Sequence, residues 1–280
     1  MDIVFLIKEN LPNFTKSQKI VAAMILEDPM AMAFSSIEQF SKQSRVSTAT
    51  IVRFANALGL NGYSELQEQL RQYCQAQLNP VSRLEQNTHS PKGEESMLDH
   101  IYNVQLNNLH LTYTPELEEK LLATVHHLKS AHHIYTCGSR GSAAITYYLG
   151  HHLNRVFRNV DILHDDSRMV DALLRIRDGD VFFLCNMPRY SKQVCRAARI
   201  ARERGARIIS ITDSIASPYD ELSHILLPAR CRSSDFHNSL LSAMLIAEML
   251  ITLLMSDDTA ATSSKLSEME PLFEDMDMFL

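Results

Sequence analysis

Residues 181–212 have the sequence VFFLCNMPRYSKQVCRAARIARERGARIISIT, in which two apolar runs, 181–185 and 207–212, flank a polar segment. The part at 192–204 has the length and polarity of a helix on a protein surface. A strand, a helix and a second strand in this order predict a βαβ unit with parallel strands. Because the run at 181–185 is apolar throughout, we expect helices to cover both faces of the sheet.

The same alternation continues on both sides of this unit. Three more short apolar runs are predicted strands: 134–137, 160–163 and 225–227. Three helices are predicted around them: 97–112, 115–129 and 237–255. The fold class predicted for 97–257 is therefore a three-layer α/β domain with a parallel sheet, followed by a tail at 258–280.

The N-terminal part of the chain, 1–77, predicts only helices, so an all-α domain precedes the α/β domain. Its segment 36–60, SIEQFSKQSRVSTATIVRFANALGL, predicts two helices joined by a short turn, the second at 48–58. Gly59 suits the end of that helix. Residues 78–96 are polar and contain prolines and a glycine, which predicts a linker between the two domains.

The second of these helices is amphipathic. Four apolar residues at helical spacing are expected to form its buried stripe: Ile51, Val52, Ala55 and Leu58. Hydroxyl and guanidinium groups are expected on its opposite face, near the start: Ser47, Thr48, Thr50 and Arg53. Such groups reach phosphates and base edges when a helix-turn-helix domain enters the major groove. The same pattern also suits a helical packing domain in which Ser47 only caps the helix.

The stretch at 36–63, and above all VSTATIVRFANALGLNGY at 46–63, resembles the N-terminal domain of the RpiR-type regulators. These are bacterial repressors and activators that pair this domain with a sugar-isomerase (SIS) domain. The resemblance implies a set of DNA contacts: Lys42, Arg45, Ser47, Thr48, Thr50 and Arg53. Within this set, Lys42 and Arg45 are the expected phosphate contacts, and such contacts make DNA affinity sensitive to salt.

Polar turns follow two of the predicted strands. Residues 138–142, GSRGS, follow the first strand, and residues 186–191, NMPRYS, follow the third. Glycines let the backbone approach a ligand closely, and a helix N-terminus favours negative charge. Ligands of open α/β sheets bind at the carboxyl ends of strands, near a switch in strand order. We therefore expect the two turns to converge on one phosphate, with Thr212 at a neighbouring strand end.

Residues 120–255 resemble the SIS domain, through the strand-GSRGS-helix unit, the strand-turn-helix at 181–204 and ARERGARIISITDSIASP at 201–218. The resemblance implies four phosphate-binding hydroxyls: Ser139, Ser142, Ser191 and Thr212. Arg140 stands where that family has a glycine, and Pro188-Arg189 stands where it has a serine-glycine pair. An arginine can bind a phosphate or carboxylate bidentately, fill the pocket, or pair with an acid across a dimer.

His237, at the predicted start of the 237–255 helix, is expected to contact the ligand. The SIS resemblance places proton transfer in isomerases on a glutamate and a histidine, and no glutamate of this chain can be assigned by motif. Catalytic residues are therefore not expected. The histidine pairs at 126–127, 132–133 and 151–152 favour surface positions over a metal site, because adjacent helical residues point to different sides. Neither a metal nor another cofactor is expected.

Composition limits the remaining classes. The formal net charge of -6 argues against a basic nucleic-acid coat over the whole chain. The 5 cysteines contain no Cys-x-x-Cys pair, which favours reduced thiols in a cytoplasmic protein over a zinc site or a disulfide framework. Polar residues interrupt the most apolar helix, at 240–255, so no membrane contact is expected.

The sequence therefore predicts a cytoplasmic transcriptional regulator that binds a palindromic DNA operator as a homodimer or homotetramer. A small phosphorylated ligand, a sugar phosphate or a related anion, is expected to change its operator affinity. Two alternatives remain: a sugar-phosphate isomerase with a helical appendage, and a sensor that regulates a protein partner through its helical domain.

Overall fold

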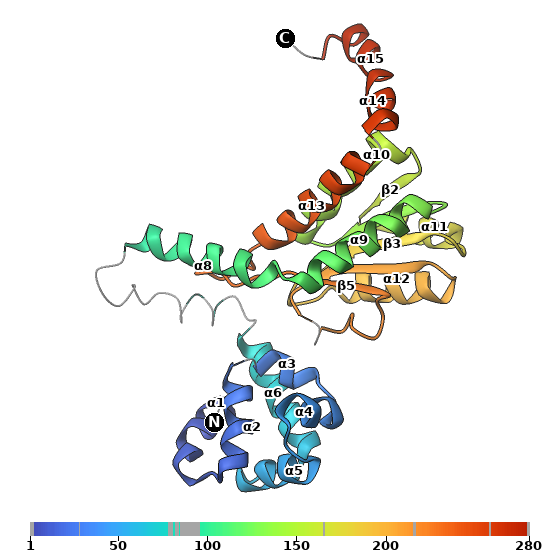
Figure 1. Cartoon of the computed structure of the whole chain (residues 1–280). Helices are drawn as coiled ribbons and strands as arrows, with labels where there is room; N and C mark the ends of the chain where they lie inside the picture. The colour runs from blue at the N-terminus through green and yellow to red at the C-terminus, as the bar shows by residue number, and fades with distance from the viewer. Residues whose placement is uncertain are drawn as a thin grey trace. The chain divides into compact units, whose positions relative to one another are not determined.

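The computed structural model describes residues 3–27, 29–77, 81, 84, 96–164, 166–214, 217–257 and 259–278. The linker predicted at 78–96 lies outside this part of the chain except at residues 81, 84 and 96. Contacts within the chain divide it into two compact units, a helical one and an α/β one, which are described separately (Figure 1). The boundaries proposed above for the two domains remain predictions.

In its described residues the helical unit contains a short 3-10 turn, Leu11–Asn13, and these α-helices: α1 (Ile3–Asn10), α2 (Lys16–Glu27), α3 (Pro29–Phe34), α4 (Ile37–Ser44), α5 (Thr48–Ala57) and α6 (Tyr63–Gln77). The sequence sets two of these starts locally, at α4 and at α5, where Ser36 and Ser47 are the capping residues. At the start of α4, Gln39 N–H donates to Ser36 Oγ over 3.2 Å, and Ser36 N–H donates to Gln39 Oε1 over 2.7 Å. This reciprocal capping box satisfies two backbone donors.

The core of the helical unit corrects one detail of the predicted buried stripe. Ile51, Ala55 and Leu58 are buried as expected, but Val52 is only half-buried. Phe54, which the predicted stripe omits, is fully buried and packs against Phe14 with ring centroids 4.9 Å apart. The reason is tertiary: the ring packs against a residue that lies just before α2, far away along the chain.

The α/β unit contains a sheet of five parallel strands in the order β2-β1-β3-β4-β5. The strands are β1 (Ile134–Gly138), β2 (Val160–Leu163), β3 (Val181–Cys185), β4 (Arg207–Thr212) and β5 (Ile225–Pro228). Among the described residues, the helices that accompany them are α8 (Met97–Thr112), α9 (Pro115–Ser130), α10 (Ser142–Phe157), α11 (Ser167–Arg175), α12 (Lys192–Glu203), α13 (Leu241–Asp257), α14 (Thr259–Ser267) and α15 (Glu270–Asp275). The predicted fold class is confirmed.

Helices cover both faces of this sheet, as the apolar strand β3 predicts (Figure 1). Phe183 faces α9, α10 and α13, whereas its neighbours Phe182 and Leu184 face α11 and α12. Successive residues of a strand point to opposite faces, so a strand between two helical layers is apolar along nearly its whole length. In the described part of the chain, none of the helices combines the length and apolar character that a membrane span requires.

The predicted start of the last long helix was wrong. Helix α13 begins at Leu241, so His237 lies in the preceding loop and not on the helix. The Asn238 side chain donates to Pro188 O over 3.0 Å, and Ser239 Oγ accepts from Leu241 N–H over 3.4 Å. These bonds hold the loop outside the helix. The predicted tail at 258–280 contains helices α14 and α15.

Candidate functional site

The strand order places a switch point between β1 and β3. The chain moves from β1 to β2 on one side and from β3 to β4 and β5 on the other. Gly138, the last residue of β1, is in register with Cys185, the last residue of β3. The turns that follow these two strands therefore lie next to each other at the carboxyl edge of the sheet, where open α/β sheets bind ligands.

The turn after β1 is shaped by close packing against α10. A Cβ atom on Gly138 would lie 2.6 Å from Thr146 Oγ1 and 2.7 Å from Ser142 O, so only glycine fits. Ser139 and Ser142 are both buried. Burial raises the pKa of the Cys185 thiol to about 12, and a hydrogen bond from Ser142 lowers it in part. The first turn of α10 thus presents backbone N–H groups and hydroxyls beside the end of β3.

The turn after β3 is held by Asn186. Its Oδ1 accepts from Ser191 N–H over 3.2 Å, and its Nδ2 donates to the Tyr219 hydroxyl. Ser191 in turn caps α12, accepting from Val194 N–H over 3.4 Å. Because a capping serine accepts with its oxygen, its hydroxyl hydrogen remains available to another acceptor.

Thr212, at the end of β4, packs against the turn that follows β3. Its side chain is fully buried and donates to Asn186 O over 2.9 Å. The Tyr190 hydroxyl donates to Asp213 Oδ1 over 2.6 Å, and burial, followed by the Asp213 charge, raises the pKa of Tyr190. The end of β4 therefore positions the turn after β3.

Arg140 and Arg189 both have exposed side chains and left-handed backbones, with φ of 55° and 66°. The loop before α13 connects their two turns. Asn238 bonds to Pro188 O, and a Cβ on Gly141 would lie 3.6 Å from Leu240 Cδ1. The structure thus brings the serines and arginines predicted after β1 and β3 to one edge, next to this loop. His237 is exposed in the same loop.

The second predicted surface surrounds the start of α5. Lys42, Arg45, Ser47, Thr48 and Arg53 are exposed, and Thr50 is half-buried. Ser47 Oγ accepts from Thr50 N–H over 3.3 Å and lies 2.9 Å from Thr50 Oγ1. Arg53 Nε donates to Ala49 O over 3.3 Å, so its side chain lies along the outer face.

This surface also contacts α2, although no sequence pattern indicates that contact. Gln18 Nε2 donates to Arg53 O over 3.5 Å. Arg45 has a left-handed backbone, with φ of 53°, and ends α4. Helices α4 and α5 and their turn therefore form a helix-turn-helix arrangement with basic and hydroxyl groups on its outer side.

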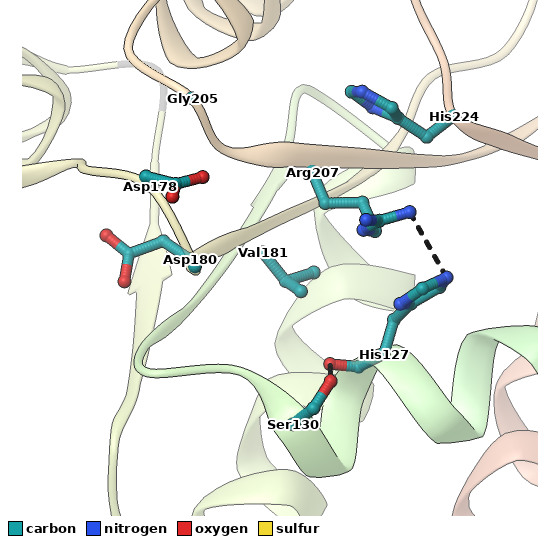
Figure 2. Close-up of a pocket in the computed structure, with 9 residues that line it drawn as sticks. His127, Ser130, Asp178, Asp180, Val181, Gly205, Arg207 and His224 are labelled. Carbon is teal, nitrogen blue, oxygen red and sulfur yellow. Dashed lines mark hydrogen bonds between the residues drawn. The ribbon is translucent and has the colours of Figure 1, made fainter.

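A polar cavity of about 170 Å³ opens at the amino edge of the sheet, opposite these turns (Figure 2). His127 from α9 lines it, with Arg207 at the start of β4 and His224 before β5. Arg207 Nη1 lies 3.2 Å from His127 Nε2. Burial and the Arg207 charge lower the pKa of both imidazoles. No motif indicated this cluster, because its members come from three separate elements.

Both histidines of the pair at 126–127 were expected at the surface. His126 is exposed as expected, whereas His127 is half-buried and lines the cavity.

The start of α11 is capped by Asp166, whose carboxylate accepts from Arg168 N–H over 3.0 Å. Across the residues that the structure describes, no three His, Cys, Asp or Glu side chains are grouped as a metal site would require.

Comparison with known proteins identifies both units. Residues 1–77 match the helix-turn-helix domain of the rpiR family, and residues 127–253 match the SIS domain. An uncharacterized HTH-type transcriptional regulator of Thermotoga maritima is 24% identical over 266 residues, which cover 93% of this chain and 94% of that protein. The HTH-type transcriptional regulator HexR of Escherichia coli is 25% identical over 218 residues, covering 76% of this chain and 73% of HexR.

Solved structures share the fold. The Vibrio vulnificus NanR protein, complexed with ManNAc-6P, has a TM-score of 0.60 at 21% identity and covers 98% of both chains. The sugar isomerase domain of an RpiR transcription factor from Sphaerobacter thermophilus has a TM-score of 0.59 at 23% identity, covering 63% of this chain and 99% of that one. With an rpiR-type helix-turn-helix domain, a SIS domain and relatives named as regulators, this chain belongs to the RpiR-type transcriptional regulators.

Proposed function

We propose that the chain binds a DNA operator through the outer face of α5 and that a small phosphorylated ligand, bound at the carboxyl edge of the sheet, changes its operator affinity. The observation that carries this proposal is the orientation of α5. Ile51, Phe54 and Ala55 are buried, while Thr48 and Arg53 on the same helix are exposed. A recognition helix requires this division between a packed face and a free one.

The DNA contacts divide by chemistry. Thr48, Thr50 and Arg53 lie near the start of α5, where a recognition helix meets base edges. Lys42 and Arg45 lie on α4 and the turn, where they can neutralise phosphates. A homodimer with two such helices would read a palindromic operator, with half-sites separated by about one turn of DNA.

The ligand contacts lie on the two turns at the switch point. Ser139 and Ser142 border the start of α10, and Ser191 caps α12. Serine hydroxyls and helix N-termini together favour a phosphate. The solved NanR protein, which shares this fold, is complexed with ManNAc-6P, and this supports a phosphorylated sugar as the ligand class. Thr212 has a supporting role, because its hydroxyl already bonds to Asn186.

Ligand binding can change operator affinity only if the ligand prefers one of two conformations of the protein. We propose that the ligand selects an arrangement of the two turns and the loop before α13, since Asn238 of this loop bonds to the turn after β3 and Leu240 lies near Gly141 of the turn after β1. The chain is expected to act without catalysis. The two turns and the loop at 230–240 contain no glutamate to serve with His237 as an acid–base pair.

The direct test is a DNA-binding measurement with promoters of neighbouring genes, with and without a panel of sugar phosphates. Arg53→Ala should reduce operator affinity by about tenfold or more, as expected for an arginine that binds a base bidentately. Arg199→Ala is the matched control: it removes an exposed arginine from α12 and should leave DNA binding unchanged. Absence of DNA binding by the wild-type chain under every ligand condition would contradict the proposal.

The ligand half is tested separately. Ser139→Ala and Ser191→Ala should abolish the response of DNA binding to the active sugar phosphate and leave ligand-free DNA binding unchanged. The same panel should also be examined for aldose–ketose interconversion. Turnover by the wild-type chain would favour a sugar-phosphate isomerase over a regulator without catalysis.

A further inference from the structure

Arginines occupy left-handed backbone positions where glycine is the usual residue. The described non-glycine residues with positive φ are Arg45, Arg140, Arg158, Arg189 and Asp277. Arg45 and Arg158 end α4 and α10, a position where this conformation is common. Arg140 and Arg189 instead lie in the turns after β1 and β3, each beside the proposed ligand site. A residue with a Cβ atom is less favourable there than glycine.

Local packing does not explain these two side chains. Both are exposed, so neither fills the interior of its turn. Among the residues that the structure describes, neither guanidinium forms a hydrogen bond or an ion pair. By contrast, Arg158, also in the left-handed region, pairs with Glu268. Two unfavourable backbone positions therefore carry cations without an internal partner, which is typical of a functional constraint.

The two arginines border the same edge of the sheet. Their turns follow neighbouring parallel strands whose last residues, Gly138 and Cys185, are in register. Adjacent strands lie about 4.8 Å apart. The loop before α13 lies next to both turns: Asn238 donates to Pro188 O, and a Cβ atom added to Gly141 would lie 3.6 Å from Leu240 Cδ1. A sugar phosphate at the proposed site would therefore lie beside both arginine-bearing turns.

The proposed site offers partners for one phosphate without these arginines. The serine hydroxyls and the N-termini of α10 and α12 supply neutral donors that suit a single phosphate. Two further full positive charges suit a second anionic group, because a guanidinium binds a carboxylate or a phosphate with two parallel hydrogen bonds. We propose that the effector is a phosphorylated sugar with a second anionic group, bound by Arg140 and Arg189. This inference rests on the proposed function.

The test uses the full chain and three probes that share a six-carbon skeleton: glucose 6-phosphate, 6-phosphogluconate and fructose 1,6-bisphosphate. The first has one anionic group, the second adds a carboxylate, and the third adds a second phosphate. Affinities are measured by calorimetry for the wild type and for Arg140→Gly, Arg189→Gly and the double variant. Glycine suits both backbone positions, so these variants should fold at least as well as the wild type.

We expect the wild type to bind a doubly anionic probe about tenfold or more tighter than glucose 6-phosphate. The double glycine variant should lose this preference and bind glucose 6-phosphate as the wild type does. The probe that the wild type binds more tightly, 6-phosphogluconate or fructose 1,6-bisphosphate, identifies the second anionic group as a carboxylate or a phosphate. Arg199→Ala, on α12, is the control for general loss of positive charge and should change no affinity.

Two results would overturn the inference and leave the proposed function standing. In one, the wild type binds all three probes equally. In the other, the arginine variants lose all three probes equally, which would place the arginines on the shared phosphate. Failure of the wild type to bind any phosphorylated probe, with DNA binding intact, would instead overturn the proposed ligand class and the inference with it.

Discussion

Two glycines in one turn, Gly138 and Gly141, have different structural requirements. Gly138 lies where β1 approaches the first turn of α10, and an added Cβ would lie 2.7 Å from the backbone oxygen of Ser142. Gly141 lies three residues further along the chain, with φ of -58°, and its added Cβ would have ordinary contact with Leu240 at 3.6 Å. The difference comes from the packing of α10 against the strand.

Gly138→Ala should therefore destabilise the α/β unit by about 1–3 kcal/mol, because backbone atoms must move to admit the methyl group. Gly141→Ala adds the same methyl group without a clash and should change the free energy of unfolding by about 0.5 kcal/mol or less. Urea denaturation followed by circular dichroism checks both. Equal stability of the two variants would show that β1 and α10 are not packed as described.

The imidazoles of His127 and His224 share the cavity at the amino edge with Arg207 (Figure 2). Burial is the larger cause of their lowered pKa values, and the Arg207 charge is the next. Ile208 N–H donates to His224 Nδ1 over 2.9 Å, so that nitrogen carries no proton. In both rings the lowered pKa favours the neutral form in the folded protein.

A histidine with a lowered folded pKa binds its proton more strongly in the unfolded chain. Its stabilising effect is complete above the unfolded pKa of about 6.5 and diminishes as the pH falls from there towards the folded value. The melting temperature should therefore decrease as the pH is lowered from about 7.5 to about 5.5. His127→Gln and His224→Asn should each reduce this fall, since neither amide titrates. The idea fails if the double variant keeps the full wild-type pH dependence.

Helix α5 shows how one element combines a structural and a functional requirement. Ser47 caps the helix through Thr50 N–H, while Thr48, the next residue, is exposed. No hydrogen bond of the Thr48 side chain is present in the described part of the chain. The start of α5 therefore contains one hydroxyl used for folding and one that is free for a DNA contact.

Ser47→Ala should lower the stability of the helical unit by about 1 kcal/mol, the usual effect of removing an N-cap. Thr48→Ala should leave stability unchanged, yet both variants should weaken operator binding. Thermal denaturation and fluorescence anisotropy with labelled operator DNA separate the two effects. A Thr48→Ala variant that binds the operator as tightly as wild type would remove Thr48 from the DNA interface.

At the scale of the whole molecule, the net charge of -6 means that the proposed DNA binding requires a local basic surface. Lys42, Arg45 and Arg53 supply such a surface on α4, the turn and α5. A cation that neutralises a DNA phosphate releases counterions, which makes affinity fall as salt rises. The number of phosphates that a side chain neutralises is therefore measurable as a change in the salt dependence of binding.

Lys42→Ala should reduce the slope of log affinity against log salt by about 0.9 for each phosphate that the lysine neutralises, and a homodimer carries two such lysines. Binding should weaken similarly for specific and non-specific DNA, because phosphates carry no sequence information. Anisotropy titrations at several salt concentrations measure the slope. Lys192→Ala, at an exposed position on α12, is the control and should leave it unchanged.

Local patterns predicted most of the elements. The runs at 160–163, 181–185 and 207–212 are β2, β3 and β4 residue for residue, and the helix predicted at 97–112 is α8. Capping serines and glycine-containing turns are short-range signals as well, so the turns after β1 and β3 could be found before the fold was known.

The sequence by itself determined the order of strands and helices, the amphipathic face of α5 and the polar turns, because each depends on residues within a few positions of one another. Only the tertiary structure decided which of these meet. It placed Phe54 against Phe14 and His127 beside Arg207. It also placed the first residue of the last long helix at Leu241 rather than at 237, where Asn238 bonds to Pro188 instead. Such contacts join residues far apart in the chain, and their energies depend on packing that no local pattern encodes.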